Sequence, residues 1–367
     1  MTAARIDRED LDHILEHTAG VWEFARNESF FITGGTGFVG TWLVESLLWA
    51  NTVHQLDAKV TVLTRDPQRY RSRSPHLACD QAVTLLGGSA EDFRFPSGSF
   101  AFVIHAATEA PRDPDLSSPV GTFDADIEGT RRVLEFARVA DAKRVLFTSS
   151  GAVYGRPPPE LQSIPETYFG APAPTDTSSA YAQAKRISEF FCSMYARVYG
   201  VNVGIARLFA FVGPHLPLDA HYAIGNFIRD ALNGGPVKIS GDGTPYRSYL
   251  YAGDLAIWLW TILFRGGAGR AYNVGSPEAI AIADLARMVA PGCELHFARR
   301  AEVGSKPPRY VPSTIRAQEE LGLRTWIALP TSIKRTKAWN ARSVTFSNAS
   351  GPPDAESRAV EPTTEGE

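Results

Sequence analysis

The sequence has few cysteines, no excess of positive charge and no long apolar run. Its three cysteines, Cys79, Cys192 and Cys293, lie far apart among 367 residues, without the spacing of a disulfide framework or a metal site. The formal net charge is -3, and no basic stripe could follow nucleic-acid phosphates. The most apolar stretch, Ala256–Phe264, is far shorter than the roughly 20 residues of a membrane-spanning helix. We therefore expect a cytoplasmic protein that binds neither nucleic acid nor membranes.

What the sequence does contain is an alternation of apolar strands and helical segments from residue 29 to about residue 208. The expected strands are Phe30–Ile32, Lys59–Leu63, Val83–Leu85, Phe102–His105, Arg144–Ser149 and Val203–Arg207. Strands that alternate with helices pair in parallel, so the pattern predicts an α/β fold with helices on both faces of the sheet. Beyond Gly213, turns rich in proline and glycine predict a smaller C-terminal lobe that binds substrate. The expected divisions are a helical extension (1–28), the sheet domain (29–212), the lobe, with segments that return to the sheet domain (213–340), and a disordered tail (341–367).

A glycine-rich turn, FFITGGTGFVG at residues 30–40, joins the first strand to a helix. Gly34 permits a tight turn, Gly37 leaves room for a pyrophosphate, and Gly40 lets the helix pack closely on its strand. The start of the helix offers free N–H groups and partial positive charge to the phosphates. In this setting the motif predicts a Rossmann-type, doubly wound parallel sheet that binds a dinucleotide.

The end of the second strand bears on the choice between NAD and NADP. In a dinucleotide fold an acidic residue here holds the ribose of NAD, whereas an arginine accommodates the 2′-phosphate of NADP. Thr64 is not acidic and Arg65 follows it, which favours NADP, although Asp66 is adjacent and Arg65 is equally explained by solvent exposure. Both dinucleotides stay open.

The strongest chemical signal is the segment SAYAQAK at residues 179–185. Residues four apart share a face of a helix, so Tyr181 and Lys185 can point to one place. A neighbouring ammonium would stabilise a phenolate, giving a base that could take a proton from a sugar hydroxyl. The alternative is that Tyr181 is a half-buried aromatic residue on a helix that only supplies core.

A strand end rich in hydroxyl groups, LFTSSGAVYG at residues 146–155, supplies a third group. Ligands bind at the carboxyl ends of strands in open α/β sheets. Ser150 could hydrogen-bond the substrate oxygen that Tyr181 deprotonates. Serines at such positions also often cap the following turn, so this residue alone decides nothing.

Together these segments resemble the extended short-chain dehydrogenase/reductase superfamily, in its nucleotide-sugar epimerase and dehydratase branch. Further motifs in the resemblance are VIHAA at 103–107, Gly213-Pro214, and GDG at 241–243 followed by Arg247 and Asp254. The resemblance implies tightly bound NAD or NADP, a nucleotide-diphospho-sugar under the lobe, and a homodimer. It implies the catalytic residues Ser150, Tyr181 and Lys185, the cofactor-binding residues Gly34, Thr36, Gly37, Phe38, Val39, Gly40, Thr64, Arg65, Ala106, Ala107, Tyr181 and Lys185, and the substrate-binding residues Thr108, Ser150, Asn226, Arg247 and Arg309. No metal is implied.

Departures from this pattern bear on the reaction. Sugar 4,6-dehydratases carry an Asp-Glu pair where this chain has Gly151 and Ala152, and decarboxylases usually keep the glutamate. The Gly-Ala form is closer to the 4-epimerases. Glu109 matches a dehydratase glutamate and could supply a carboxylate, or it could simply face water. Asp126 stands in place of the usual asparagine, and Ala210 and Ser89 also replace an asparagine and an aspartate.

We therefore expect an NAD(P)-dependent nucleotide-sugar epimerase that acts on a UDP- or dTDP-hexose through a transient 4-keto sugar. Tyr181 would take the hydroxyl proton as hydride leaves the same carbon, and the keto sugar would be reduced again on its other face. Two alternatives remain open. One is a 4,6-dehydratase or decarboxylase that uses Glu109, and the other is a Rossmann protein that binds nucleotide without catalysis.

Overall fold

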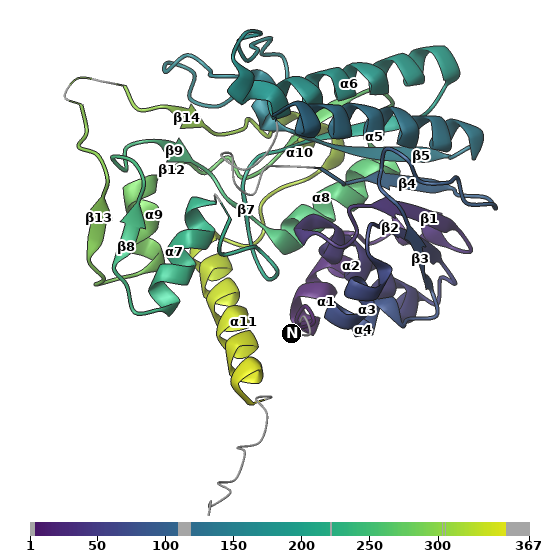
Figure 1. Ribbon diagram of the computed structural model, residues 1–367, viewed down its shortest axis with the longest axis horizontal. Helices are drawn as coiled ribbons and strands as arrows, with labels where there is room; N and C mark the ends of the chain where they lie inside the picture. The colour runs from purple at the N-terminus through teal and green to yellow at the C-terminus, as the bar shows by residue number, and fades with distance from the viewer. Residues whose placement is uncertain (1–3, 109–118, 221, 303, 305, 350–367) are drawn as a thin grey trace, which may run out of the picture.

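A seven-stranded parallel sheet forms the centre of the protein (Figure 1). The computed structural model describes residues 4–108, 119–220, 222–302, 304 and 306–349. The strand order is β11-β6-β5-β4-β1-β2-β3, and every pairing in this sheet is parallel. The strands are β1 (Ser29–Thr33), β2 (Lys59–Thr64), β3 (Val83–Gly87), β4 (Phe102–His105), β5 (Arg144–Ser150), β6 (Val203–Leu208) and β11 (Ala271–Val274). The α/β, doubly wound prediction is confirmed, and all six predicted strands lie in this sheet.

The order of the strands places the candidate site. β1 has β2 on one side and β4 on the other, so the chain reverses its direction of winding at β1. Ligands in doubly wound sheets bind beyond the carboxyl ends of the strands at such a reversal. The glycine turn after β1 and the serine at the end of β5 are therefore on the same edge of the sheet, with β4 between their strands.

Helices cover both faces of the sheet, each over its own apolar cluster. One face carries α2 (Phe38–His54) and α8 (Ala252–Arg265), and the other carries α5 (Pro119–Val139) and α6 (Ala180–Tyr199), which pack side by side (Figure 1). Burial on both sides explains why the strands read as continuous apolar runs without alternation. Helix α8 is buried over almost its entire length. Among the described residues no helix combines the length and apolarity needed to cross a bilayer.

The N-terminal extension packs on the α8 side of the sheet. It consists of α1 (Arg8–His17) and a short 3-10 helix, η1 (Trp22–Ala25). Two polar contacts fix it in place: the Tyr251 hydroxyl donates to Asp10 at 2.6 Å, and His13 Nε2 lies 2.9 Å from Asp254. Asp254 also accepts from the backbone N–H groups of Trp326 and Ile327, so this residue of the family motif joins three segments of the chain.

The smaller lobe has its own apolar cluster. Its helices are α7 (Ala223–Leu232), α9 (Ile282–Val289) and α11 (Leu329–Ala349), and its short strands include β8 (Val237–Ile239), β9 (Tyr246–Arg247), β12 (Ile280–Ala281), β13 (Leu295–Phe297) and β14 (Arg309–Tyr310). Strands β12, β9 and β14 form one small sheet, and β13 and β8 form another. One expectation is corrected here: helix α11 continues to Ala349, although the sequence placed the start of a disordered tail at residue 341. The remaining tail, 350–367, lies outside the described residues.

Candidate active site

The turn after β1 is built from close backbone contacts. Gly34 has φ +71, and a Cβ atom there would lie 2.4 Å from the carbonyl carbon of Ala106. A Cβ atom on Gly40 would lie 2.2 Å from the carbonyl oxygen of Gly34. Gly37 differs, because the nearest atom to its Cβ position is the Gly34 oxygen at 3.4 Å. Gly34 and Gly40 are therefore needed for close packing, whereas the backbone of Gly37 has free space beside it.

The open backbone of Gly37 stands at the start of α2. This 17-residue helix has no side-chain cap at its N-terminus. The first N–H groups of a helix need partners, and they carry partial positive charge. Phe38 and Val39 follow in the first turn, and their side chains pack partly against the core. These features fit the pyrophosphate of a dinucleotide.

The ends of β4 and β1 are tied together next to this turn. The Ala106 N–H donates to the Thr33 carbonyl at 3.1 Å, and the Ala107 N–H donates to the Thr33 hydroxyl at 3.2 Å. That hydroxyl also lies 2.7 Å from Nδ1 of buried His105. The Ala106-Ala107 segment is thereby held against Gly34, beside the place expected for the cofactor.

At the end of β2, Thr64 is buried and its hydroxyl accepts from the Asp66 N–H at 3.3 Å, while Arg65 is exposed. The turn after β3 carries Ser89 where the family has an aspartate. A carboxylate is nevertheless present there, because Asp92 accepts from both the N–H and the hydroxyl of Ser89, at 3.1 and 2.6 Å. These hydrogen bonds hold the pKa of Asp92 below its usual value.

Ser150 ends β5 and begins the next turn. Its hydroxyl oxygen accepts from the Ala152 N–H at 3.1 Å, so the serine caps the short 3-10 helix η2 (Gly151–Tyr154). The side chain of Ser150 also lies near the phenol of Tyr181, in the first turn of α6, and acts to lower the pKa of that phenol. Capping and a place beside Tyr181 are therefore compatible, and the sequence had set them as alternatives.

The four-residue spacing in α6 brings Lys185 under Tyr181. The ammonium nitrogen of Lys185 lies 5.7 Å from the centre of the Tyr181 ring and 5.2 Å from the centre of the Phe147 ring. Lys185 is 1% exposed, and its ammonium nitrogen lies 3.7 Å from a carboxylate oxygen of Asp126 in α5. The residue that replaces the family's asparagine thus forms a buried ion pair with the candidate catalytic lysine.

These surroundings shift the pKa values of Tyr181 and Lys185. Burial raises the pKa of Tyr181 to about 12, and Asp126 raises it further, while hydrogen bonds with Ser150 and Thr108 oppose the rise. Burial lowers the pKa of Lys185, and Asp126 opposes that change. Lys185 is not among the groups that shift the pKa of Tyr181 in this arrangement. A cationic ring bound beside Tyr181 would act in the lowering direction.

His105, at the end of β4, is structural. Its two ring nitrogens lie near hydroxyl groups, Nδ1 at 2.7 Å from Thr33 and Nε2 at 3.2 Å from Thr130. Burial and the charge of Lys185 lower the pKa of His105 to about 3. The imidazole is therefore neutral, and it joins the turn after β1 to helix α5.

A buried polar network fixes helix α6 against the sheet. Glu189 accepts from the Ser149 hydroxyl at 2.5 Å and forms a two-pronged ion pair with Arg207, at 2.7 and 2.9 Å. Arg207 donates to the Tyr154 hydroxyl at 2.8 Å, which in turn donates to Asn273 at 2.7 Å. This network links β5, β6 and β11 to α6, so it holds the first turn of α6, with Tyr181, at the strand end that carries Ser150.

The lobe contributes two residues on one face of its small sheet. Tyr310 pairs with Arg247 in the parallel register of β14 and β9, and the Arg247 guanidinium lies 5.6 Å from the centre of the Tyr310 ring. The Tyr310 hydroxyl oxygen lies 2.5 Å from the position that a Cβ atom on Gly151 would take, so this face points to the catalytic strand end. Tyr310 is a residue that sequence reasoning missed, because nothing local in KPPRYVP distinguishes it from a surface tyrosine.

Arg309 lies on the opposite face of β14, because successive residues of a strand point to opposite sides. Its guanidinium stacks on Tyr246, 4.3 Å from the ring centre, and its Nε donates to the Gln162 carbonyl. The structure therefore does not bring Arg309, a candidate substrate-binding residue, together with Arg247: the two guanidinium groups are on different faces. Asn226, in α7, is half-buried and accepts from Arg229.

Two candidate residues precede the segment 109–118. The Thr108 hydroxyl donates to Asp126 at 3.4 Å and acts to lower the pKa of Tyr181, so it lies with the catalytic group. Glu109 lies outside the described residues. Among the residues that are described, no cluster of histidine, cysteine and carboxylate side chains could hold a metal ion.

Comparison with known proteins shows which family has this sequence pattern. Residues 30–275, about two thirds of the chain, match the model of the NAD dependent epimerase/dehydratase family. The chain belongs to this family. Its NAD-dependent Rossmann architecture and the family's chemistry on nucleotide sugars follow from that membership, and the predicted recognition is confirmed.

The similar proteins divide among several reactions of the epimerase/dehydratase family. UDP-glucuronic acid decarboxylase 1 of Xenopus tropicalis is 28% identical over 309 residues, which span 83% of this chain and 70% of that protein. The structure of a UDP-glucose 4-epimerase of Thermotoga maritima, solved with UDP-glucose, superposes with a TM-score of 0.71 at 22% identity and covers 86% of this chain and 99% of that one. The structure of a dTDP-glucose 4,6-dehydratase of Streptomyces venezuelae, solved with NAD, superposes with a TM-score of 0.72 at 23% identity. It covers 87% of this chain and 98% of that one.

In this epimerase/dehydratase chain the position before Ala152 has no room for a side chain. A Cβ atom on Gly151 would lie 2.5 Å from the Tyr310 hydroxyl oxygen and 2.9 Å from the ring of Phe209. The space next to Ser150 that an acidic residue would need is therefore filled by a phenol from the lobe. The absence of the Asp-Glu pair is a matter of packing as well as of sequence.

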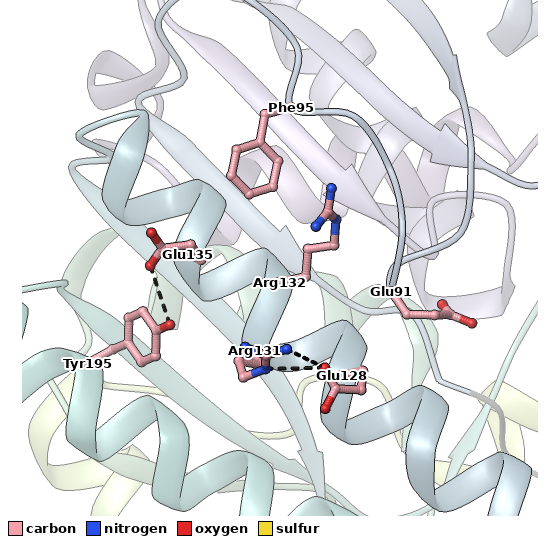
Figure 2. Close-up of a pocket in the computed structure, with 7 residues that line it drawn as sticks. All are labelled: Glu91, Phe95, Glu128, Arg131, Arg132, Glu135 and Tyr195. Carbon is pink, nitrogen blue, oxygen red and sulfur yellow. Dashed lines mark hydrogen bonds and ion pairs between the residues drawn. The ribbon is translucent and has the colours of Figure 1, made fainter.

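A separate hollow of about 350 Å³ lies on the outer side of α5 and α6. Figure 2 shows its charged lining, with Arg131 paired to Glu128 and Tyr195 reaching Glu135. The catalytic group does not line this hollow. It belongs to the outer helical surface of the epimerase/dehydratase domain.

Proposed function

We propose that this protein is an NAD(P)-dependent nucleotide-sugar epimerase that acts on a UDP- or dTDP-hexose through a transient 4-keto sugar. The observation that carries the proposal is the meeting of the Ser150 hydroxyl and the Tyr181 phenol above buried Lys185, at a strand end that lacks carboxylates at 151 and 152. Such a group can remove and return one hydroxyl proton. It has no acid at that strand end to expel a second hydroxyl.

The roles of the chain's own residues follow from their surroundings. Ser150 would hold the reacting oxygen of the sugar by a hydrogen bond, and Tyr181 would take its proton and later give it back. Lys185, kept in position by Asp126, would stabilise the phenolate form of Tyr181. Thr108 would orient the same phenol. When bound, the dinucleotide would supply a reversible hydride acceptor, so an epimerisation leaves the cofactor unchanged.

The residues expected to hold the cofactor fit a dinucleotide. Gly34 and Gly40 shape the turn, Gly37 and Thr36 would face the pyrophosphate, and Ala106 would lie beside the nicotinamide half. Thr64 and exposed Arg65 would meet the adenosine ribose, and both NAD and NADP remain candidates. The oxidised nicotinamide is cationic, which would lower the high pKa of Tyr181 towards the working range.

The lobe would bind the rest of the substrate. Arg247 is the candidate for the diphosphate, since a guanidinium makes two parallel hydrogen bonds to phosphate oxygens. Asn226 is a weaker candidate for the same ligand. The exposed apolar side chains of α6, which include Phe190, Val198 and Tyr199, support the expectation of a homodimer through the α5 and α6 face.

Decarboxylation is the second candidate, and a specific observation favours it. Similar proteins from frog, plant and fish are UDP-glucuronic acid decarboxylases, at 26–29% identity. A 4-keto uronic acid is a β-keto acid, which loses carbon dioxide without a strong acid or base in the protein. Glu109 remains the candidate carboxylate for this route or for elimination of water.

A substrate panel separates these reactions. The purified protein would be incubated with UDP-glucose, UDP-galactose, dTDP-glucose and UDP-glucuronic acid, and the products read by mass spectrometry and NMR. We expect a 4-epimer of unchanged mass. Loss of the mass of carbon dioxide from UDP-glucuronic acid would establish the decarboxylase, loss of water would establish a dehydratase, and binding of dinucleotide without any product would favour a non-catalytic role. Tyr181→Phe is the control that should abolish turnover.

A further inference from the structure

Asp126 lies in α5 beside the catalytic group, and its side chain is buried. One of its carboxylate oxygens, Oδ2, lies 3.7 Å from the ammonium nitrogen of Lys185 and accepts from the Thr108 hydroxyl at 3.4 Å. The family pattern has an asparagine at this position. This chain therefore carries a negative charge where a neutral amide is usual.

A network of hydroxyl groups holds this turn of α5 against α6. The Thr130 hydroxyl donates to the Asp126 carbonyl at 2.6 Å and lies 3.0 Å from the hydroxyl of Ser188 in α6. Nε2 of His105, at the end of β4, lies 3.2 Å from the same Thr130 hydroxyl. These contacts fix the position of residue 126 relative to α6, which carries Lys185 and Tyr181.

The charge of Asp126 is close enough to Tyr181 to act on it. The Lys185 nitrogen lies 3.7 Å from Oδ2 of Asp126 and 5.7 Å from the centre of the Tyr181 ring, so this oxygen and the ring centre are at most about 9.4 Å apart. Asp126 and Lys185 are buried, and buried charges at such a separation are only weakly screened by salt. A carboxylate this near disfavours a phenolate, because two negative charges would then lie close together.

The other titratable groups that face this site come from three elements. They are Glu189 and Cys192 in α6, His105 at the end of β4, and Tyr310 in β14. Glu189 is paired with Arg207 at 2.7 Å, and burial raises the pKa of the Cys192 thiol, so the thiol keeps its proton. His105 is neutral, because its pKa is about 3. Asp126 is therefore a charge that one substitution of similar shape can remove without breaking the pair of Glu189 and Arg207.

We propose that Asp126 is a positioning residue that holds the Lys185 ammonium and, by its charge, opposes the loss of the proton from Tyr181. The base of this chain is thereby set to act at higher pH than it would with asparagine at residue 126. In agreement with this geometry, Asp126 adds to the rise that burial causes in the pKa of Tyr181. The proposal rests on the proposed function only in taking Tyr181 as the group that is deprotonated.

The test is the titration of the phenol at residue 181 in the protein saturated with NAD⁺ or NADP⁺, whichever it binds. Tyr181 is replaced by 3-fluorotyrosine as a reporter, and its fluorine NMR shift is measured against pH. In Asp126→Asn the midpoint should move to lower pH by at least about 0.5 unit, because the nearby negative charge is gone. The matched control is Asp124→Asn, which removes the same charge from an exposed position of the same helix and should leave the midpoint unchanged.

Asparagine separates the charge of residue 126 from its contacts. Its side-chain oxygen still accepts from Thr108 and Lys185, so a role in holding the lysine alone predicts no change of the midpoint. If Asp126→Asn fails to fold, the comparison is made between Lys185→Met and Lys185→Met/Asp126→Asn. The double variant removes both charges of the pair, and its midpoint should lie below that of the single variant.

A midpoint that stays unchanged or rises in Asp126→Asn overturns the proposal, as does an equal fall in Asp124→Asn. These titrations need no substrate. A protein that converts no nucleotide sugar but shows the fall would therefore refute the proposed reaction while leaving the role of Asp126 intact.

Discussion

The turns after β1 and after β5 lie at the same edge of the sheet, but they are built in opposite ways. The first is made of backbone: Gly34 and Gly40 close on each other and on Ala106. The second is a meeting of side chains, in which the Tyr310 hydroxyl from β14 and the ring of Phe209 close on Gly151. The first turn is determined almost entirely by a short sequence, whereas the second exists only after distant elements have come together.

The difference predicts different responses to substitution. A substitution in the first turn should act on packing and dinucleotide binding. The loss of stability should be larger the closer the added Cβ atom comes to its nearest neighbour. A substitution around the second turn should act through contacts between side chains. A second substitution, in a partner residue from another element, should recover part of the lost stability.

Lys185→Met should have the largest effect. It leaves the Asp126 carboxylate buried without its cation, which costs about 3–5 kcal/mol of unfolding free energy. Urea unfolding measures the loss. The matched variant Lys185→Met/Asp126→Leu removes both charges and should recover most of the stability, though not activity. Equal stability of the wild type and Lys185→Met would mean that the pair is not formed.

Gly40→Ala and Gly37→Ala should separate packing from binding in the first turn. The new Cβ of Gly40→Ala would meet a backbone oxygen at 2.2 Å, so we expect a loss of about 3 kcal/mol. In Gly37→Ala the nearest atom is at 3.4 Å, so stability should stay within about 0.5 kcal/mol of the wild type while dinucleotide affinity falls. Calorimetric titration with NAD⁺ and NADP⁺ gives the affinities. Similar stability losses in both variants would contradict this division.

Gly151→Ala should disturb the second turn by about 1–2 kcal/mol, less than the change at Gly40, because the atoms it meets belong to side chains. The methyl group would displace the Tyr310 hydroxyl. Combined with Tyr310→Phe the loss should be smaller than the sum of the two single changes. Additive losses in a double-mutant cycle would show that the two positions are independent.

His105 should give a graded effect of pH on stability. Its pKa is about 3 in the folded protein and near 6.5 when unfolded, so the unfolded chain binds the extra proton between these values. The contribution of His105 to the free energy of unfolding is therefore fully present above pH 6.5. It is lost as the pH drops towards 3, by up to about 1.4 kcal/mol per pH unit. Urea unfolding as a function of pH measures the slope, and His105→Gln should reduce it. An unchanged slope would contradict a neutral, buried imidazole.

The contrast between the turns also explains what the sequence could predict. Strand periodicity and the glycine spacing depend on neighbouring residues, so the six strands and the residues of the first turn were predictable. The four-residue spacing in a helix similarly placed Lys185 below Tyr181. The boundary at residue 341 was wrong because the polar residues there continue a helix already begun at Leu329.

The partners of the catalytic residues could not be predicted in the same way. Asp126 was seen as a departure from the family, but its ion pair with Lys185 depends on how α5 packs beside α6. Tyr310 and Arg309 are adjacent in sequence, and only the register of β14 against β9 decides which of them faces Ser150. The sequence analysis named Arg309 as a candidate for the substrate and did not name Tyr310.

The central claim is that Ser150, Tyr181 and Lys185 act on a sugar hydroxyl beside a bound nicotinamide. The most direct measurement is rapid mixing of the dinucleotide-loaded protein with the nucleotide sugar it converts, while the absorbance of reduced nicotinamide is followed. We predict a transient rise in the wild type and a rise slowed by about 10²–10⁴-fold in Tyr181→Phe. An equal rate in both proteins would contradict the assignment of Tyr181 as the base.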